Sequence, residues 1–285
     1  MRGGVLAATP LYVYDMRDVE LPKYVYKYVT WEKEYHKKIL TDNEIFFTSA
    51  SNFNDPFDSS VPLRYDLGSD DQLLNLCIDH VRRDNPYLTD SEVKRVARNV
   101  LRENNPRSPD WINYHIKVQR EYAATNFGIL SCSTSNNSIL MWSHYAKYHQ
   151  GICLRFNCEK FRNYFHSDEC VKNDLIVYWD FINYENDYPL QNPFILDENE
   201  SYVKQLLIKS KDWEYEKEIR FILFSHPNKV VTIPNNIIDQ VILGCKISND
   251  NKNEIIEIAN NKKIELLQSV LKQDEFGLEF SNINV

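Results

Sequence analysis

Three glutamates and an arginine alternate along one stretch of this chain and could carry chemistry. They are Glu214, Glu216, Glu218 and Arg220, and the apolar residues 221–224 follow them directly. That apolar, aromatic tail predicts a strand, on which residues two apart share a face and lie about 6.6 Å from each other. Like charges at this spacing repel, unless a cation, a ligand hydroxyl or Arg220 offsets them. Such a row could stabilise a developing positive charge, or it could be a charged edge strand that discourages aggregation.

A second polar segment, Ser133-Thr134-Ser135, ends a predicted strand and precedes a predicted helix. Hydroxyls at this place could hold a phosphate or a ribose, helped by exposed N–H groups at the start of the helix. Capping and turn hydrogen bonds are the alternative interpretation.

The predicted helix itself carries His144 next to Tyr145. This pair could bind a ligand or move a proton, although an isolated histidine is more often a hydrogen-bonded structural residue.

Two aspartates lie on a proline turn, Asn54-Asp55-Pro56-Phe57-Asp58, directly after a predicted strand. They could bind Mg²⁺ together with water molecules, or they could satisfy the backbone of their own turn. The histidines and cysteines form no zinc pattern, so we assign no metal ligand.

The elements that must position these residues indicate an α+β fold with a helix-rich first half and a mostly antiparallel β core in the second half. We expect a lead-in over residues 1–22 and one catalytic-like domain over 23–285, with a helical insertion at about 70–126. The predicted strands cover residues 23–28, 44–50, 127–133, 151–156, 230–233 and 240–247, with a β-rich segment at 171–184. The predicted helices cover residues 31–40, 70–84, 91–104, 111–126, 139–147, 200–209 and 251–260.

Composition limits the classes of function. The 285 residues include 33 basic and 41 acidic ones, a net charge of −8 that exerts no general attraction on nucleic acid or anionic membranes. The predicted helix 91–104 is locally basic through Lys94, Arg95, Arg98 and Arg102. The 6 cysteines form no CxxC pair, and no apolar run approaches a membrane span of about 20 residues. We therefore expect a cytoplasmic protein with reduced thiols and no membrane partner.

Four motifs together resemble a widespread bacterial domain of unknown function. They are Tyr26-Lys27-Tyr28, the turn 54–58, the helix Met141-Trp142-Ser143-His144-Tyr145-Ala146, and Glu216-Lys217-Glu218-Ile219-Arg220. The resemblance spans residues 23–247 and implies no activity.

A second resemblance, to mono-ADP-ribosyltransferases, implies an activity and a site. That family carries a polar residue on an early strand, a Ser-Thr-Ser on a middle strand and a Glu-x-Glu on a late strand. This chain has Lys27 and Tyr28 in the early place, where the family usually has arginine or histidine. Residues 133–135 follow in the middle and Glu216 with Glu218 at the end. The order and the predicted strands match.

The resemblance implies that NAD is the substrate and that Glu218 stabilises the positive charge formed on its ribose. Glu216 would orient or deprotonate the acceptor, and Ser133 and Thr134 would brace the strand of the glutamates. The implied dinucleotide-binding residues are Lys27, Tyr28, Ser133, Thr134, Ser135, His144, Tyr145 and Arg220, of which Arg220 could grip a diphosphate bidentately.

The leading hypothesis is therefore an ADP-ribosyltransferase-like enzyme that modifies a nucleic acid, preferably RNA, or a protein. It would act as a bacterial toxin or phage-defence effector, and a neutralising antitoxin would be among its partners. One alternative is a Mg²⁺-dependent nuclease or phosphoesterase that uses Asp55, Asp58, Glu216 and Glu218. The other alternative is a non-catalytic module that binds a nucleotide or a partner.

Overall fold

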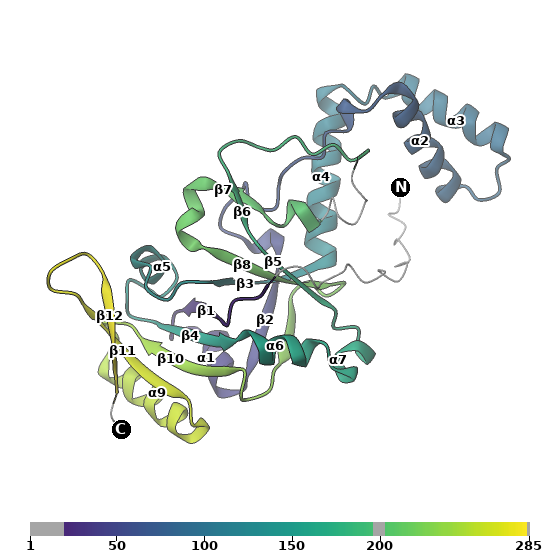
Figure 1. Cartoon of the computed structure of the whole chain (residues 1–285). Coiled ribbons are helices and arrows are strands. Elements are labelled where there is room, and N and C mark those ends of the chain that lie inside the picture. The colour runs from purple at the N-terminus through teal and green to yellow at the C-terminus, as the bar shows by residue number, and fades with distance from the viewer. Residues whose placement is uncertain (1–19, 196–202, 284–285) are drawn as a thin grey trace.

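The predicted α+β class is confirmed by a computed structural model, which describes residues 20–195 and 203–283 (Figure 1). Most of the predicted lead-in, residues 1–22, lies outside the described residues.

A large, mostly antiparallel sheet forms the centre of the molecule. Its strands run in the order β12-β11-β10-β4-β1-β3-β2-β9, with β8 paired to β3 and β5 paired to β8. Only β10 and β11 pair in parallel in this sheet, as far as the described residues go. The strands are β1 Tyr24–Val29, β2 Glu44–Ser49, β3 Phe127–Ser133, β4 Ile152–Asn157, β5 Val177–Phe181, β8 Glu218–Phe224, β9 Lys229–Thr232, β10 Ile238–Leu243, β11 Glu265–Leu271 and β12 Leu278–Asn282. A separate parallel pair consists of β6, Asn183–Glu185, and β7, Ile208–Ser210.

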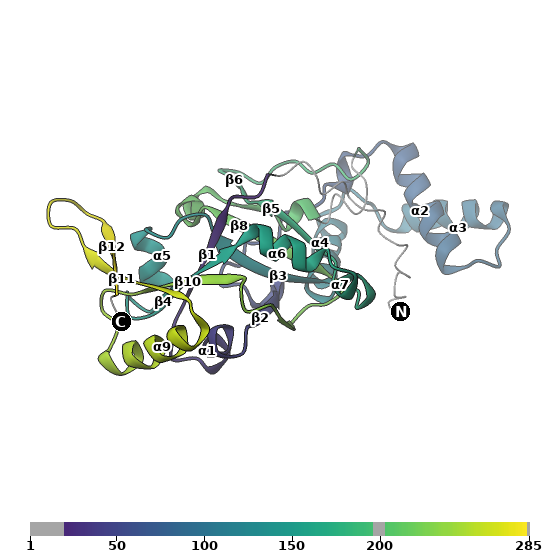
Figure 2. The ribbon, with the colours of Figure 1, turned by 60° about the horizontal axis from the view of Figure 1, so that its bottom comes forward.

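Helices cover both faces of this sheet (Figures 1 and 2). On one face, α1 (Glu34–Thr41), α6 (Cys158–Phe165) and α9 (Asn249–Lys262) contribute to the main hydrophobic core. On the other face, α4 (Pro109–Asn126) and α5 (Ile139–His144) pack into two smaller clusters. Successive side chains of β8 point to opposite faces of the sheet, so Ile219 lies in the main core and Ile222 in a smaller cluster.

Two helices between β2 and α4 project away from the sheet as an arm, which we define as α2 and α3 (Figures 1 and 2). Helix α2 spans Asp70–Asp84, as predicted, and α3 spans Asp90–Glu103. A capping box formed by Thr89 and Glu92 begins α3. A short helix, α7 (Asp168–Lys172), follows α6.

The predicted strand through the glutamates begins later than expected. Residues Lys211–Glu216 form the 3₁₀-helix η3 instead, and Lys217 ends it with a left-handed backbone at φ 46°. Strand β8 begins only at Glu218, so the prediction of one strand face lined by Glu214, Glu216 and Glu218 is wrong. The cause is local, because the Ser210 side chain caps the start of η3.

The helix predicted over 200–209 is confirmed only in part, because residues 203–205 are helical whereas Ile208–Ser210 is strand β7. The helix predicted over 139–147 ends at His144, because residues 147–149 adopt positive φ angles and turn the chain. Helix α6 and strands β11 and β12 were not predicted.

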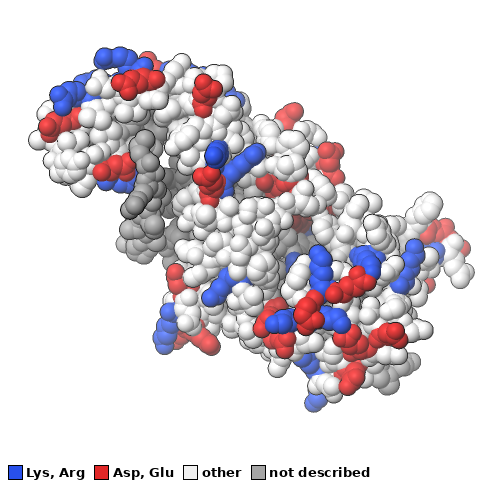
Figure 3. Space-filling model, turned by 180° about the vertical axis from the view of Figure 1, so that it is seen from behind, with Lys and Arg blue, Asp and Glu red and all other residues white. Residues whose placement is uncertain are grey.

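No helix among the described residues is both long enough and apolar enough to cross a membrane. Basic and acidic side chains are interspersed over the face in Figure 3, where neither sign forms a continuous surface.

Candidate functional site

A buried cluster of charged side chains lies where β8 begins. Arg220 is 1% exposed and donates to both oxygens of Asp58, from Nη1 at 2.8 Å and from Nη2 at 2.6 Å. Its Nε donates to Oε1 of Glu218 at 2.8 Å, and Nη1 also donates to the carbonyl of Leu206 at 2.6 Å. The guanidinium group therefore holds two carboxylates that are far apart in the sequence.

Lys209 is the second cation of this cluster. Its ammonium group donates to Glu216 at 2.5 Å and to Glu218 at 3.0 Å, and it lies 3.6 Å from Asp58. The five side chains face inward and none is more than 7% exposed. Three carboxylates and two cations would carry a net charge of −1 if all were ionised.

The register of the sheet explains how the glutamates meet the Ser-Thr-Ser segment. Strands β3 and β8 pair along their whole length, and Ser133 is the direct partner of Glu218. Direct partners in an antiparallel pair point to the same face, so Ser133, Glu218 and Arg220 share one side of the sheet. Asp58 reaches this side from the proline turn after β2, and Lys209 reaches it from β7.

Hydroxyl groups of the Ser-Thr-Ser segment hold the backbone that carries the glutamates. The Ser133 hydroxyl donates to the carbonyl of Glu216 at 2.6 Å, and the Thr134 hydroxyl donates to the carbonyl of Lys217 at 3.2 Å. The Ser135 hydroxyl donates to the side chain of Asn137 at 2.8 Å. Ser133 and Thr134 thus fix the Glu216–Glu218 connection through its main chain.

The two early residues, Lys27 and Tyr28, point to opposite faces of β1. Tyr26 pairs directly with Ser133, so Tyr28 lies on the same face as Glu218, and Lys27 lies on the opposite one. The Tyr28 hydroxyl donates to the carbonyl of Ser135 at 2.8 Å. The Lys27 ammonium donates to the carbonyl of Ser131 at 3.0 Å. Only Tyr28 faces the same side as the glutamates.

Of the pair His144 and Tyr145, only Tyr145, the residue directly after α5, contacts the cluster. The Tyr145 hydroxyl donates to Oε1 of Glu216 at 2.5 Å. His144 is exposed, and its ring lies 6.1 Å from that of Tyr215 without touching either glutamate. A residue that was not predicted, Tyr184, accepts the backbone N–H of Glu218 at 2.8 Å.

The two glutamates have pKa values displaced in opposite directions. Burial alone would raise the pKa of Glu218, but the charges of Arg220 and Lys209 outweigh it and lower that pKa to about 2. For Glu216, burial is the largest effect and the charge of Glu218 adds to it, so its pKa is raised in spite of Lys209. Glu218 is therefore ionised at neutral pH, and Glu216 is the carboxyl that holds a proton more readily.

The pKa values of Lys209 and Tyr145 are both raised in this cluster. Burial opposes the charged form of Lys209, but Glu218, Glu216 and Asp58 outweigh it and raise the pKa of the ammonium group. The pKa of Tyr145 is raised by burial and by the adjacent Glu216 carboxylate, so its hydroxyl stays protonated and acts as a donor.

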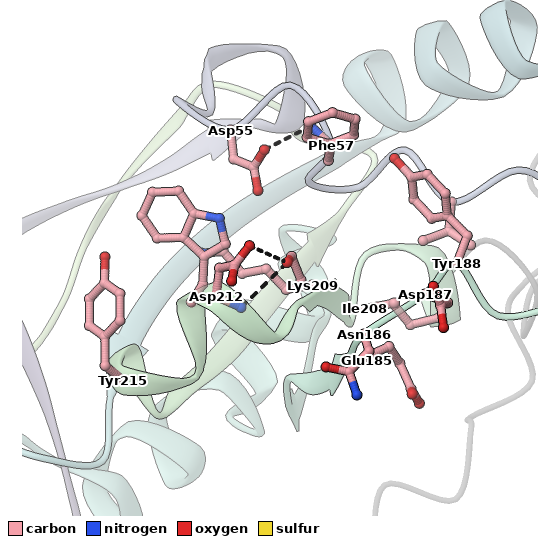
Figure 4. Close-up of a pocket in the computed structure, with 13 residues that line it drawn as sticks. Asp55, Phe57, Glu185, Asn186, Asp187, Tyr188, Ile208, Lys209, Asp212 and Tyr215 are labelled. Atoms are coloured by element: carbon pink, nitrogen blue, oxygen red, sulfur yellow. Dashed lines mark hydrogen bonds between the residues drawn. The ribbon is translucent and has the colours of Figure 1, made fainter.

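A pocket of about 530 Å³ opens beside this cluster (Figure 4). Its walls come from the turn after β2, from the segment after β6, and from β7 with η3. Lys209 lines the pocket and separates it from Glu216 and Glu218, which do not line it. Asp55 lines the pocket as well, so the two aspartates of the proline turn have different places: Asp58 is inside the cluster and Asp55 faces the pocket.

The carboxylates do not form a metal site among the described residues, where no group of three or more His, Cys, Asp or Glu side chains is placed to hold an ion. Lys209 and Arg220 occupy the positions between Asp58, Glu216 and Glu218 that a Mg²⁺ ion would need. The geometry therefore does not favour the magnesium-dependent alternative.

Three residues of the cluster and its surroundings could not be assigned from the sequence. Lys209 fell in a predicted helix, Tyr184 in a segment described only as β-rich, and Asp58 was considered only as a metal ligand or a turn residue. The spacing of the motifs could not reveal the parallel β6–β7 pair that brings Lys209 to the glutamates.

Part of the chain matches the model of a known family. Residues 141–221 match the model of DUF2971, a protein family of unknown function. The matched segment runs from α5 through most of β8 and includes Tyr145, Lys209, Glu216 and Glu218. No curated protein and no solved structure matches the chain significantly.

Proposed function

We propose that this protein is an ADP-ribosyltransferase-like enzyme with NAD as its substrate. One observation carries the proposal: Glu216 and Glu218 contact the same ammonium group, yet their pKa values are displaced in opposite directions. When their environments give two carboxyl groups different pKa values, one can stabilise positive charge in its ionised form while the other transfers a proton.

The proposed chemistry uses each carboxyl in one role. Glu218, ionised at neutral pH, stabilises the positive charge that forms on the ribose as its bond to nicotinamide breaks. Nicotinamide leaves with the bonding electrons, and the acceptor forms a new bond to the same ribose carbon. Glu216, which is hydrogen-bonded to Tyr145, takes the proton that the acceptor releases.

For this chemistry, Lys209 must lose its hydrogen bond to Glu218. Both oxygens of Glu218 are engaged: Oε1 accepts from Arg220 Nε at 2.8 Å, and Oε2 accepts from Lys209 at 3.0 Å and from Arg220 Nη2 at 3.3 Å. A ribose hydroxyl that enters from the pocket would replace the Lys209 ammonium at Oε2, while Arg220 keeps the carboxylate in position through its contacts to both oxygens. Lys209 can be displaced from this side because it lines the pocket wall.

The hydrogen bonds around the glutamates support the same assignment. Ser133 and Thr134 fix the backbone at Glu216 and Lys217, and a fixed backbone is what a pre-organised charge-stabilising group needs. Tyr28 faces the glutamate side and stays in the proposal as a dinucleotide contact. Lys27 faces the other side, and we leave it out.

For the acceptor we propose a nucleic acid, with RNA as the first choice. Helix α3 exposes Lys94, Arg95, Arg98 and Arg102 on the projecting arm. Basic side chains along one exposed helix can contact a phosphate backbone without reading its sequence.

Incubation with labelled NAD tests the proposal. The full-length protein is mixed with labelled NAD and with cellular RNA, DNA or protein, beside the variants Glu218→Gln and Glu214→Gln. Glu214 lies in η3, is exposed and belongs to the same sequence motif, so it is the matched control. We expect transfer by the wild type and Glu214→Gln, and a rate about 100-fold to 1000-fold lower for Glu218→Gln.

Because Glu218 also belongs to a buried ion-pair cluster, the rates are compared well below the melting temperature of each variant. A loss of rate in fully folded Glu218→Gln supports the catalytic role. No consumption of NAD by the folded wild type with any acceptor contradicts the proposal.

A second candidate, a non-catalytic binding module, is favoured by one observation. The carboxylate of Glu218 is fully engaged in ion pairs and does not line the pocket, as expected for a structural residue. On this reading Glu218→Gln lowers stability, leaves the ligand affinity of the folded protein unchanged, and no turnover occurs with the wild type.

A further inference from the structure

The pocket beside the glutamates has acidic walls that the proposed transfer chemistry does not use. Four carboxylates line it, from Asp55, Glu185, Asp187 and Asp212. Lys209 is the single basic residue among the described lining residues, and its ammonium group is engaged by Glu216 and Glu218 behind the wall. The pocket therefore presents uncompensated negative charge to whatever enters it.

One of these carboxylates is buried and incompletely satisfied. Asp55 is 7% exposed; its Oδ1 accepts the backbone N–H of Phe57 at 2.9 Å, whereas its Oδ2 has no hydrogen-bond partner among the described residues. Figure 4 shows this second oxygen directed toward the side of the pocket that carries Asp212. A buried carboxylate oxygen without a donor is costly, and a ligand that brings a donor removes that cost.

Aromatic rings complete the pocket. Phe57, Tyr188, Trp213 and Tyr215 line it together with the acids. Trp213 already accepts a cation, because the Lys209 ammonium lies 5.1 Å from the centroid of its ring. Electron-rich ring faces together with carboxylates attract positively charged groups more strongly than neutral ones.

The size of the pocket excludes a bare ion as its natural occupant. About 530 Å³ lies within the range of small-molecule sites. The described acids do not converge on a single point, since no group of three is placed to hold a metal ion. A guanidinium group fits these walls well, because it is planar, stacks on rings and donates two parallel hydrogen bonds to a carboxylate.

We infer that this pocket binds a small organic cation with a guanidinium or alkylammonium group, which donates to Oδ2 of Asp55 and stacks on the surrounding rings. The inference rests on the pocket alone, and since the proposed function brings the ribose of NAD in through the same pocket, the cation and NAD would compete for it.

Calorimetric titration of the full-length protein tests the inference without NAD. Agmatine supplies a free guanidinium metabolite, and spermidine supplies alkylammonium groups. N-acetylarginine amide and N-acetylcitrulline amide are a matched charged and neutral pair of nearly equal shape. We expect at least one of the cations to bind, and the arginine derivative to bind about tenfold or more tightly than the citrulline derivative.

Three variants locate the binding. Asp55→Asn keeps the acceptor for the Phe57 N–H but loses the charge, and Asp212→Asn changes an exposed residue of the same pocket. Asp274→Asn changes an exposed aspartate in the turn between β11 and β12, far from the pocket, and is the control. We expect Asp55→Asn to weaken binding about tenfold or more and Asp212→Asn to weaken it by a smaller factor, with Asp274→Asn unchanged.

If Asp55→Asn does not fold, the exposed Asp212→Asn variant and the citrulline comparison decide the question. The inference is wrong if no cation binds at millimolar concentration, if citrulline and arginine derivatives bind equally, or if the folded pocket variants bind as the wild type does.

Discussion

At the scale of single residues, Arg220 and Lys209 determine the state of the glutamates. Burying a carboxylate without a partner costs several kcal/mol, so each acid of the cluster must have a cation or remain protonated. Asp58 and Glu218 form ion pairs with Arg220, and Glu216 and Glu218 both form ion pairs with Lys209. With two cations for three carboxyls, the raised pKa of Glu216 is the expected consequence, since one proton on Glu216 makes the cluster neutral.

The lowered pKa of Glu218 predicts a loss of stability in acid. Its pKa is about 2 in the folded protein against an ordinary value of 4.5, so it stabilises the fold above about pH 4.5. This contribution, on the order of 3 kcal/mol, is lost as the pH falls from about 4.5 toward 2. We expect urea unfolding between pH 7 and pH 3 to show a steep fall for the wild type and a flatter one for Glu218→Gln.

Glu216 provides the comparison for this experiment, because its raised pKa acts with the opposite sign. The folded protein binds the Glu216 proton more tightly than the unfolded chain does, so this residue favours folding in acid relative to neutral pH. The stability of Glu216→Gln should therefore fall with acid at least as steeply as that of the wild type. Equal curves for Glu218→Gln and the wild type would contradict the assignment of the low pKa to Glu218.

At the scale of elements, the site depends on one change of backbone between η3 and β8. Lys217, at φ 46°, ends the 3₁₀-helix and lets the chain continue as a strand. Through this turn both Glu216 and Glu218 reach Lys209 although they do not share a strand. The left-handed conformation is unfavourable for residues with a side chain, and most of all for β-branched ones.

Substitution of Lys217 tests the importance of this turn. The side chain is exposed, so its loss should matter little by itself. We expect Lys217→Ile to lower the free energy of unfolding by about 1–2 kcal/mol and Lys217→Gly to leave it nearly unchanged, because glycine adopts positive φ freely. Chemical denaturation measures both.

Lys229→Ile is the matched control, since Lys229 is an exposed residue of strand β9, where an isoleucine is well tolerated. Similar losses for Lys217→Ile and Lys229→Ile would show that the backbone of Lys217 is not the cause.

Local patterns predicted most elements but not the convergence of the site. Helix α2 and strand β3 were predicted with their observed bounds, because hydrophobic spacing and caps are local signals. The Glu-rich segment was predicted as a strand because alternation cannot reveal a left-handed residue between two glutamates. Lys209 was missed for a different reason: its strand pairs with β6, and that pairing depends on residues more than twenty positions away.

At the scale of the whole molecule, the sheet and the arm formed by α2 and α3 have separate cores. The arm is held together by its own buried residues, Cys77, Ile78, Val81, Val93 and Ala97. At its base, Arg107 donates to the carbonyl of Gly68 at 2.8 Å and joins the two ends of the arm. The main core of the sheet is much larger, so the arm should open at a lower free energy than the sheet.

Hydrogen exchange measured residue by residue tests this difference. We expect amides of α2 and α3 to exchange through openings several kcal/mol lower in free energy than those of β3 and β8. Val93, which is 1% exposed, lies at the centre of the arm's core. Val93→Ala should therefore lower the protection of the arm by about 2 kcal/mol and leave the amides of β3 and β8 unchanged.

Ala123→Gly in α4 is the reciprocal control. The side chain of Ala123 packs against β3 and β8, so its loss should weaken the protection of the amides in these strands. If Val93→Ala instead lowers protection equally in the arm and in the strands, the molecule unfolds as one unit. In that case a ligand bound to the basic residues of α3, Lys94, Arg95, Arg98 and Arg102, would affect the glutamates only by stabilising the whole fold. The arm would then not open separately to present an acceptor to them.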